Sequence, residues 1–324
     1  MMSHGNSRDG LAPFQSEIIQ FEIKHLSSSP DWRALYPFAS QHLRLGDLQY
    51  HYVDEGPADK QQREPLLMVH GNPTWSFYWR NLIAGLSDDR RTIAVDHIGC
   101  GLSSKPQNYP YTLSQHVDNL VQLVETLDLR GVTLLAHDWG GAIGLGAAER
   151  LQDRFARIIL FNTGAYPPFF VPKRIAACRI PVLGTVALRG FNAFARSAVT
   201  MATERPEGLA PAVAAGLLAP YDSWQNRVAV DGFVKDIPFT RRHPTWQTLE
   251  HIEDGLKAFA NRPIGLVWGM RDWCFTPACL ERFLLHWPNA ETLRINEAGH
   301  YVVEDAPERI IPWVRSFLER HPQP

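Results

Sequence analysis

From residue 42 onward the chain alternates short apolar runs with amphipathic stretches, and this alternation predicts most of its elements. Residues 43–52 carry apolar side chains at alternating positions around Gly46, a pattern typical of two strands joined by a turn. Short apolar runs indicate further strands at 66–69, 92–95, 132–136, 157–161, 264–268 and 292–295. Helical periodicity predicts helices at 75–86, 114–127, 140–151, 278–286 and 307–318. Ser114 is the expected cap of the second helix.

Strands that alternate with helices favour a mostly parallel sheet with helices on both faces, which makes the chain an α/β protein. The alternation stops at about residue 165 and returns after residue 250. Between these points Pro, Phe, Ala and Arg are frequent, and no strand pattern is found. We interpret the segment as an inserted helical cap, or lid. The predicted domains are an N-terminal extension (1–34), a core (35–164 and 251–324) and the cap (165–250).

Composition narrows the classes of function. The 324 residues are 45% hydrophobic and 20% charged, as expected of a folded globular protein. The formal net charge of -2 argues against a general nucleic-acid binder, which usually has an excess of basic residues. The chain has no apolar run of about 18 residues and no apolar signal segment at its start, so we expect no membrane span and a cytoplasmic location. The four cysteines lack metal-ligand spacing, and we expect no disulfide framework and no metal.

The strongest chemical signal is the segment His137-Asp138-Trp139-Gly140-Gly141, where a buried strand runs directly into a helix. A tight turn of this kind lifts one side chain clear of the sheet and directs backbone N–H groups at the same space. The raised residue is Asp138, a carboxylate that is ionised at neutral pH and can attack an electrophilic carbon directly. The alternative is that Asp138 only caps the following helix, as many aspartates do.

A second signal is the turn His70-Gly71-Asn72-Pro73, which follows the strand at 66–69. In this position a backbone N–H lies beside the raised carboxylate. Together with the N–H of Trp139 it would form an oxyanion hole. The alternative is an ordinary strand-to-helix turn, in which Gly and Pro are common.

The remaining groups of a catalytic triad are found late in the chain. His300 stands in a loop after the last predicted strand, and the order of nucleophile first and histidine last is that of the α/β hydrolases. Asp272 follows the strand at 264–268 and is the expected acid that orients the imidazole. The alternative for Asp272 is an ion-paired loop residue.

These segments resemble the haloalkane dehalogenase family of α/β hydrolases, in the branch that also contains olefin-forming β-lactone decarboxylases. The resemblance rests on His-Gly-Asn-Pro-Thr-Trp-Ser-Phe at 70–77, Asp-His-Ile-Gly-Cys-Gly-Leu-Ser at 96–103, His-Asp-Trp-Gly-Gly at 137–141 and Ala-Gly-His-Tyr at 298–301. It extends in order from about residue 35 to residue 320. It implies an α/β-hydrolase fold with a cap, and an enzyme that needs neither cofactor nor metal.

The resemblance also implies roles for the residues. Asp138 would displace halide from carbon while the amide of Asn72 and the indole N–H of Trp139 stabilise the departing anion. His300, oriented by Asp272, would then activate water to hydrolyse the Asp138 ester and release an alcohol. Some relatives carry a Glu after the strand that follows the elbow helix. Here that strand ends in Leu-Phe-Asn-Thr, which favours Asp272 as the acid.

The expected partners are a small apolar substrate and a halide ion, with no nucleic acid; the resemblance leaves open a homo-oligomer or a larger assembly. Aromatic residues of the cap are candidates for the substrate pocket, although each is equally compatible with packing inside the cap. They are Phe169, Phe170, Phe191, Phe194 and Trp224.

Three alternatives to haloalkane dehalogenation remain. A β-lactone decarboxylase would use the same Asp138 to open a strained ring. An epoxide hydrolase would need cap tyrosines, for which Tyr166 and Tyr221 are candidates. A catalytically inactive binding protein is disfavoured by the complete set Asp138, Asp272 and His300.

Overall fold

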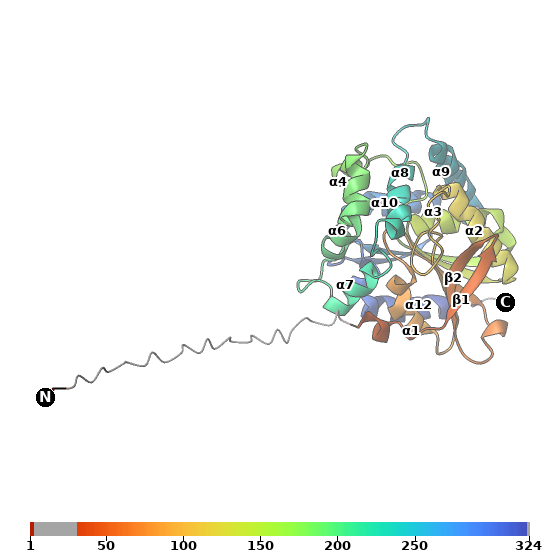
Figure 1. Cartoon of the computed structure of the whole chain (residues 1–324). Coiled ribbons are helices and arrows are strands. Elements are labelled where there is room, and N and C mark those ends of the chain that lie inside the picture. The colour runs from red at the N-terminus through yellow and green to blue at the C-terminus, as the bar shows by residue number, and fades with distance from the viewer. Residues whose placement is uncertain (3–30, 323–324) are drawn as a thin grey trace.

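An eight-stranded sheet forms the centre of the protein in a computed structural model that describes residues 1–2 and 31–322 (Figure 1). The strands are β1 (Ser40–Leu45), β2 (Leu48–Glu55), β3 (Pro65–Val69), β4 (Arg91–Val95), β5 (Val132–Asp138), β6 (Phe155–Thr163), β7 (Ile264–Gly269) and β8 (Glu291–Ile295). Their order in the sheet is β1-β2-β4-β3-β5-β6-β7-β8. Strand β2 pairs antiparallel with both of its neighbours, and the other pairs are parallel. The predicted α/β-hydrolase fold is confirmed.

Each face of the sheet carries its own apolar core because successive side chains of a strand point in opposite directions. In β3, Leu67 and Val69 join one core, whereas Leu66 and Met68 join the other. All five residues of β3 are buried, which explains why its sequence is a continuous apolar run instead of an alternating one.

Two groups of helices cover these faces. Helix α1 (Arg80–Leu86) packs against α12 (Pro307–Arg320), and α3 (Trp139–Arg150) packs against α2 (Leu113–Thr126) and α9 (Pro244–Gly255). The remaining core helices are α10 (Pro277–His286) and the short α11 (Val302–Asp305).

Two local predictions are corrected. Helix α2 is capped by Thr112, whose side chain accepts from the N–H of Gln115, because the chain is already helical at Ser114. The helix predicted at 75–86 begins instead as a 3₁₀ turn at Ser76–Trp79 and becomes α-helical at Arg80.

Between β6 and β7, a stretch described in full, the chain forms helices and no strand. These are α4 (Lys173–Ala177), α5 (Leu183–Thr185), the π-helical η5 (Val186–Gly190), α6 (Ala193–Met201), α7 (Pro211–Leu218), η6 (Gln225–Arg227) and α8 (Val228–Asp236), followed by α9 and η7 (Leu256–Phe259). Figure 1 shows α4 and α6 along one edge of the molecule, far from β1 and β2. The bounds of the cap, 165–250, stay a prediction.

Most of the predicted extension, residues 3–30, lies outside the described residues. Its last part forms a short 3₁₀ helix, η1 (Trp32–Leu35), and the ring of Trp32 packs edge-on against Trp75 and Phe77. The extension therefore ends in contact with the core. Among the described residues, no helix is long and apolar enough to cross a membrane.

Candidate active site

The turn between β5 and α3 holds Asp138 in a strained backbone conformation, with φ 54° and ψ −130°. A non-glycine residue in this region costs energy and is found most often at functional sites. The turn needs glycine beside it, because a Cβ on Gly140 would lie 2.1 Å from the carbonyl oxygen of Val69. The side chain of Asp138 makes no capping hydrogen bond to α3. The geometry therefore speaks against a mere capping role.

Two backbone N–H groups converge on the Asp138 carboxylate. The N–H of Asn72, in the turn after β3, donates to Oδ1 at 2.7 Å, and the N–H of Trp139 faces the same carboxyl group and lowers its pKa. Burial raises the pKa of the Asp138 carboxyl, and this effect exceeds the lowering by the His300 ring and the two N–H groups. These two donors are the ones expected to form an oxyanion hole.

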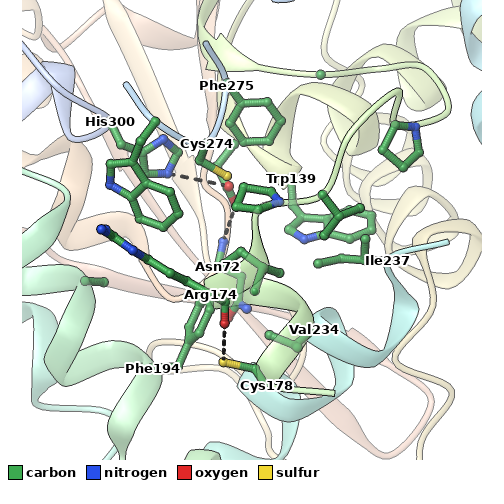
Figure 2. Close-up of a pocket in the computed structure, with 18 of the residues that line it drawn as sticks. Asn72, Trp139, Arg174, Cys178, Phe194, Val234, Ile237, Cys274, Phe275 and His300 are labelled. Carbon is green, nitrogen blue, oxygen red and sulfur yellow. Dashed lines mark hydrogen bonds and ion pairs between the residues drawn. The ribbon is translucent and has the colours of Figure 1, made fainter. Parts of the chain in front are cut away.

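His300 connects Asp138 to Asp272. Its Nε2 lies 3.6 Å from Oδ2 of Asp138, and its Nδ1 lies 2.8 Å from Oδ2 of Asp272. Figure 2 shows the His300 ring at the cavity, near Cys274 and Phe275. Burial alone would lower the pKa of His300, but the carboxylates of Asp272 and Asp138 raise it above its ordinary value. The structure thus brings the three predicted triad residues together, from the carboxyl ends of β5, β7 and β8.

Asp272 is buried and held in one orientation. Its Oδ1 accepts from the N–H groups of Cys274 and Phe275, at 2.6 and 3.1 Å. Its Oδ2 accepts from the side-chain amide of Asn162 at 3.0 Å as well as bonding to His300. Asp272 forms no ion pair with Lys or Arg among the described residues, so the alternative of an ion-paired surface loop does not fit its surroundings.

Asn162 is a further residue of the site, and no role for it was predicted from the sequence. Only the absence of an acidic residue at the end of its strand was noted. It lies near the end of β6 with φ 25°, and its amide accepts from the N–H of Gly269 at 2.7 Å. Asn162 therefore fastens the loop that carries Asp272 to the neighbouring strand. The available signal was a polar residue at the end of an otherwise apolar strand.

The His137 side chain contacts the backbone of the loop that carries His300. Its Nε2 lies 2.9 Å from the backbone carbonyl oxygen of His300, and its ring stacks on Tyr78 with centroids 4.6 Å apart. Complete burial lowers the pKa of His137 well below its ordinary value. The ring is therefore neutral, and with Nε2 protonated it donates to this carbonyl.

The side chains of Asn72 and Trp139 lie at the bottom of a cavity of about 410 Å³. The Nδ2 of Asn72 donates to the carbonyl oxygen of Val230 in α8, 3.3 Å away. The indole N–H of Trp139 forms no hydrogen bond with any described residue. Each group retains a hydrogen that is available to a ligand, since an amide has two N–H donors.

The cavity extends from Asp138 into the cap, and Figure 2 shows part of its lining. Phe169, Phe170 and Phe194 line it, as expected. Trp224 and Phe191 do not, which corrects their assignment to the pocket. Trp224 lies on the protein surface, where the Arg189 guanidinium stacks 4.7 Å from its ring centroid, and Phe191 is 70% exposed.

The two candidate tyrosines of an epoxide hydrolase are already engaged. Tyr166 lines the cavity, but its hydroxyl donates to the carbonyl oxygen of Cys279 at 3.2 Å. Tyr221 lies outside the cavity, and its hydroxyl donates to the carbonyl oxygen of Thr74 at 3.0 Å. Both hydroxyls are engaged with backbone carbonyls, so neither of these two candidates fits the role of protonating an alkoxide.

The model of the family described as "alpha/beta hydrolase fold" matches residues 64–307. The chain belongs to this family. Within it, this α/β hydrolase is 41% identical to a cis-3-alkyl-4-alkyloxetan-2-one decarboxylase from Xanthomonas campestris, over 84% of the chain and 92% of the relative. It is 39% identical to a decarboxylase of the same name from Shewanella oneidensis, over 88% and 89%.

Haloalkane dehalogenases are also relatives of this α/β hydrolase. Haloalkane dehalogenase 2 of Mycobacterium tuberculosis is 31% identical, over 85% of the chain and 93% of the relative. The solved structure of the dehalogenase DatA from Agrobacterium tumefaciens matches with a TM-score of 0.78 at 28% identity, covering 87% and 96% of the two chains. The resemblance predicted from the four motifs is therefore confirmed, and it includes both activities.

Proposed function

We propose that this α/β hydrolase is a β-lactone decarboxylase, which converts a cis-3-alkyl-4-alkyloxetan-2-one into an alkene and carbon dioxide. The observation that carries the proposal is its identity of 39% and 41% to two decarboxylases of that name, against 31% to the mycobacterial dehalogenase. The site supports it, because the Asp138 carboxyl group lines a largely apolar cavity that suits a substrate with two alkyl chains.

The first chemical step opens the ring. An oxygen of the Asp138 carboxylate attacks the alkyl-bearing ring carbon that is bonded to the ring oxygen, and a new carbon–oxygen bond forms as the old one breaks. The product is an alkyl ester of Asp138 that carries a free carboxylate on the adjacent carbon. Release of ring strain drives this step, and the departing carboxylate delocalises its own charge.

The second step removes carbon dioxide. The bond between the carboxylate carbon and its neighbour breaks, and its electron pair forms the carbon–carbon double bond. The ester bond to Asp138 breaks at the same time, so the Asp138 carboxylate is regenerated without water. The N–H groups of Asn72 and Trp139 and the adjacent His300 ring stabilise this carboxylate as its charge returns.

The direct test combines product analysis with isotope labelling. Purified protein and a cis-dialkyl β-lactone in water enriched in oxygen-18 are expected to give a cis-alkene, with Asp138 unlabelled in its peptide after many turnovers. Label in Asp138 together with a β-hydroxy acid as product would show hydrolysis and contradict the proposal. No alkene from lactones of short and long chains, with halide released from bromoalkanes, would also contradict it.

Haloalkane dehalogenation is the second candidate, favoured by the unpartnered indole N–H of Trp139 and the neighbouring amide of Asn72 among the described residues. Two N–H donors over a carboxylate nucleophile suit a small leaving anion. The DatA dehalogenase has the same overall fold as this protein. In this reaction His300 activates water to hydrolyse the Asp138 ester, which regenerates the nucleophile.

Trp139→Phe tests the donor, since it keeps an aromatic ring and removes the N–H. We expect bromide release from primary bromoalkanes to fall by about 10²-fold, the usual cost of losing one preorganised donor. Lactone opening should fall much less, because its leaving group needs less stabilisation. Bromide release within twofold of wild type in both Trp139→Phe and Asn72→Ala would exclude these residues as leaving-group donors.

A further inference from the structure

The outer wall of the cavity is also an exposed apolar surface. We define the cap strip as residues 168–201, which begin shortly after β6 and run through α4, α5 and η5 to the end of α6. Eight large apolar side chains of the strip are exposed, with Val182 at 73% and Phe191 at 70%. The others are Phe169, Phe170, Ile180, Leu183, Val186 and Met201. Exposed apolar groups at this density usually mark an interaction site.

The charges of the cap strip all have one sign. The strip contains five basic residues and no acidic one, although the whole chain has a net charge of -2. None of the five forms an ion pair within the described part of the chain. They are Lys173, Arg174, Arg179, Arg189 and Arg196. A cationic apolar surface is complementary to an anionic apolar one, and it is poorly suited to pairing with a second copy of itself.

The cap strip forms a large part of the cavity wall. Phe169 and Phe170 line the cavity and are about half exposed, so they form its rim. Arg174 and Phe194 of the same strip also line it, and both are drawn in Figure 2. An apolar molecule that leaves Asp138 along this route therefore meets the strip before it meets bulk water.

Val182, the most exposed of these side chains, has a strained backbone conformation that lowers the stability of the fold. It has φ 64° and ψ −57° and is the central residue of a γ-turn closed by the Leu183 N–H and the Pro181 carbonyl, a strained turn that a β-branched residue seldom adopts. Glycine would adopt a positive φ at a lower cost and would expose no apolar side chain. A strained and exposed valine at this position is better explained by a contact outside the protein than by folding.

We propose that the cap strip docks on the surface of an anionic phospholipid membrane. Its apolar side chains would enter the boundary between headgroups and acyl chains, while its exposed cations Lys173, Arg174 and Arg196 contact lipid phosphates. The cavity would then open toward the bilayer, where apolar substrates and an alkene product are most soluble. The proposal concerns the source of the substrate and holds for a lactone or a haloalkane alike.

The test is sedimentation of the full-length protein with sucrose-loaded vesicles. We expect binding to vesicles of phosphatidylcholine with one part in four of phosphatidylglycerol to exceed binding to pure phosphatidylcholine by at least about tenfold, because each cation near an anionic surface contributes about fivefold. Salt at about 0.5 M should reduce the difference, since it screens the charges. The assay needs no turnover, so its result is independent of the proposed reaction.

Three substitutions locate the contact. Leu183→Asp is expected to reduce vesicle binding about tenfold or more, and Leu285→Asp is its matched control, since Leu285 is 84% exposed on α10 outside the strip. Val182→Gly should also weaken binding while its Tm stays at or above that of wild type, because glycine relieves the strained backbone. Loss of binding in Val182→Gly therefore cannot be ascribed to unfolding.

Equal binding to neutral and anionic vesicles, or equal losses in Leu183→Asp and Leu285→Asp, would overturn the proposal. So would absence of vesicle binding together with self-association in analytical ultracentrifugation that Leu183→Asp abolishes. In that case the occupant of the strip would be a second copy of the chain.

Discussion

Asp138→Asn is expected to abolish alkene formation, lowering turnover of a β-lactone by roughly 10⁴-fold or more. An amide is neutral and cannot displace the ring oxygen from carbon, so the covalent intermediate never forms. The buried N–H groups of Asn72 and Trp139 would still face the side chain at position 138. Alkene quantified by gas chromatography under steady-state conditions gives the measurement. Residual activity above about a tenth of wild type would exclude Asp138 as the nucleophile.

Stability supplies the control for this variant. The folded-state pKa of Asp138 is raised by burial, so its ionised form is less favourable in the folded protein than in the unfolded chain. This cost is absent below the ordinary pKa of about 3.8 and grows as pH rises through the raised folded value. The neutral amide of the Asp138→Asn variant carries no such cost. Near neutral pH the variant should therefore unfold at a Tm no lower than that of wild type.

His300→Phe is expected to separate the two activities of this family. Dehalogenation should release about one halide per protein molecule and then stop, because hydrolysis of the Asp138 ester loses its general base, an effect of about 10⁴-fold. Alkene formation should continue at a reduced rate, about 10²–10³-fold below wild type, because it needs stabilisation of a carboxylate but no activated water. Mass spectrometry of the Asp138 peptide identifies the trapped alkyl ester.

A control substitution at another histidine shows whether the loss of activity is specific to position 300. His251→Phe removes a histidine of α9 whose side chain is 73% exposed, and it should leave both reactions near wild type. If His300→Phe slowed alkene formation as severely as ester hydrolysis, the water-independent second step would be wrong. If no ester accumulated with a bromoalkane that wild type consumes, His300 would not be the hydrolytic base.

The core and the turn that carries Asp138 were predictable because they depend on local patterns. Buried strands appear as short apolar runs, and the sharp turn at Asp138 is encoded by the adjacent Gly140 and Gly141. The relation of Asp272 to His300 was predictable from chain order, because neighbouring parallel strands end at the same edge of a sheet.

The interior of the cap was less predictable for a physical reason. Short helices separated by Pro and Gly reveal no consistent apolar face, so nothing in the pattern distinguishes Phe194, which lines the cavity, from Trp224, which lies outside. Asn162 escaped notice because its role is purely relational: its amide matters only through Gly269 and Asp272, 107 and 110 residues away in sequence.

The parallel sheet separates the parts of this enzyme that must stay constant from those that can vary. Asn72, Asp138, Asn162, Asp272 and His300 each follow a different strand, or stand at the end of one, so the protein's rigid scaffold alone sets their mutual distances. Much of the cavity wall instead comes from the segment between β6 and β7, and Trp273 and Phe275 of the loop after β7 add to it. Changes in that segment can therefore alter the shape of the cavity while the distances between the carboxylate, the imidazole and the N–H donors stay fixed.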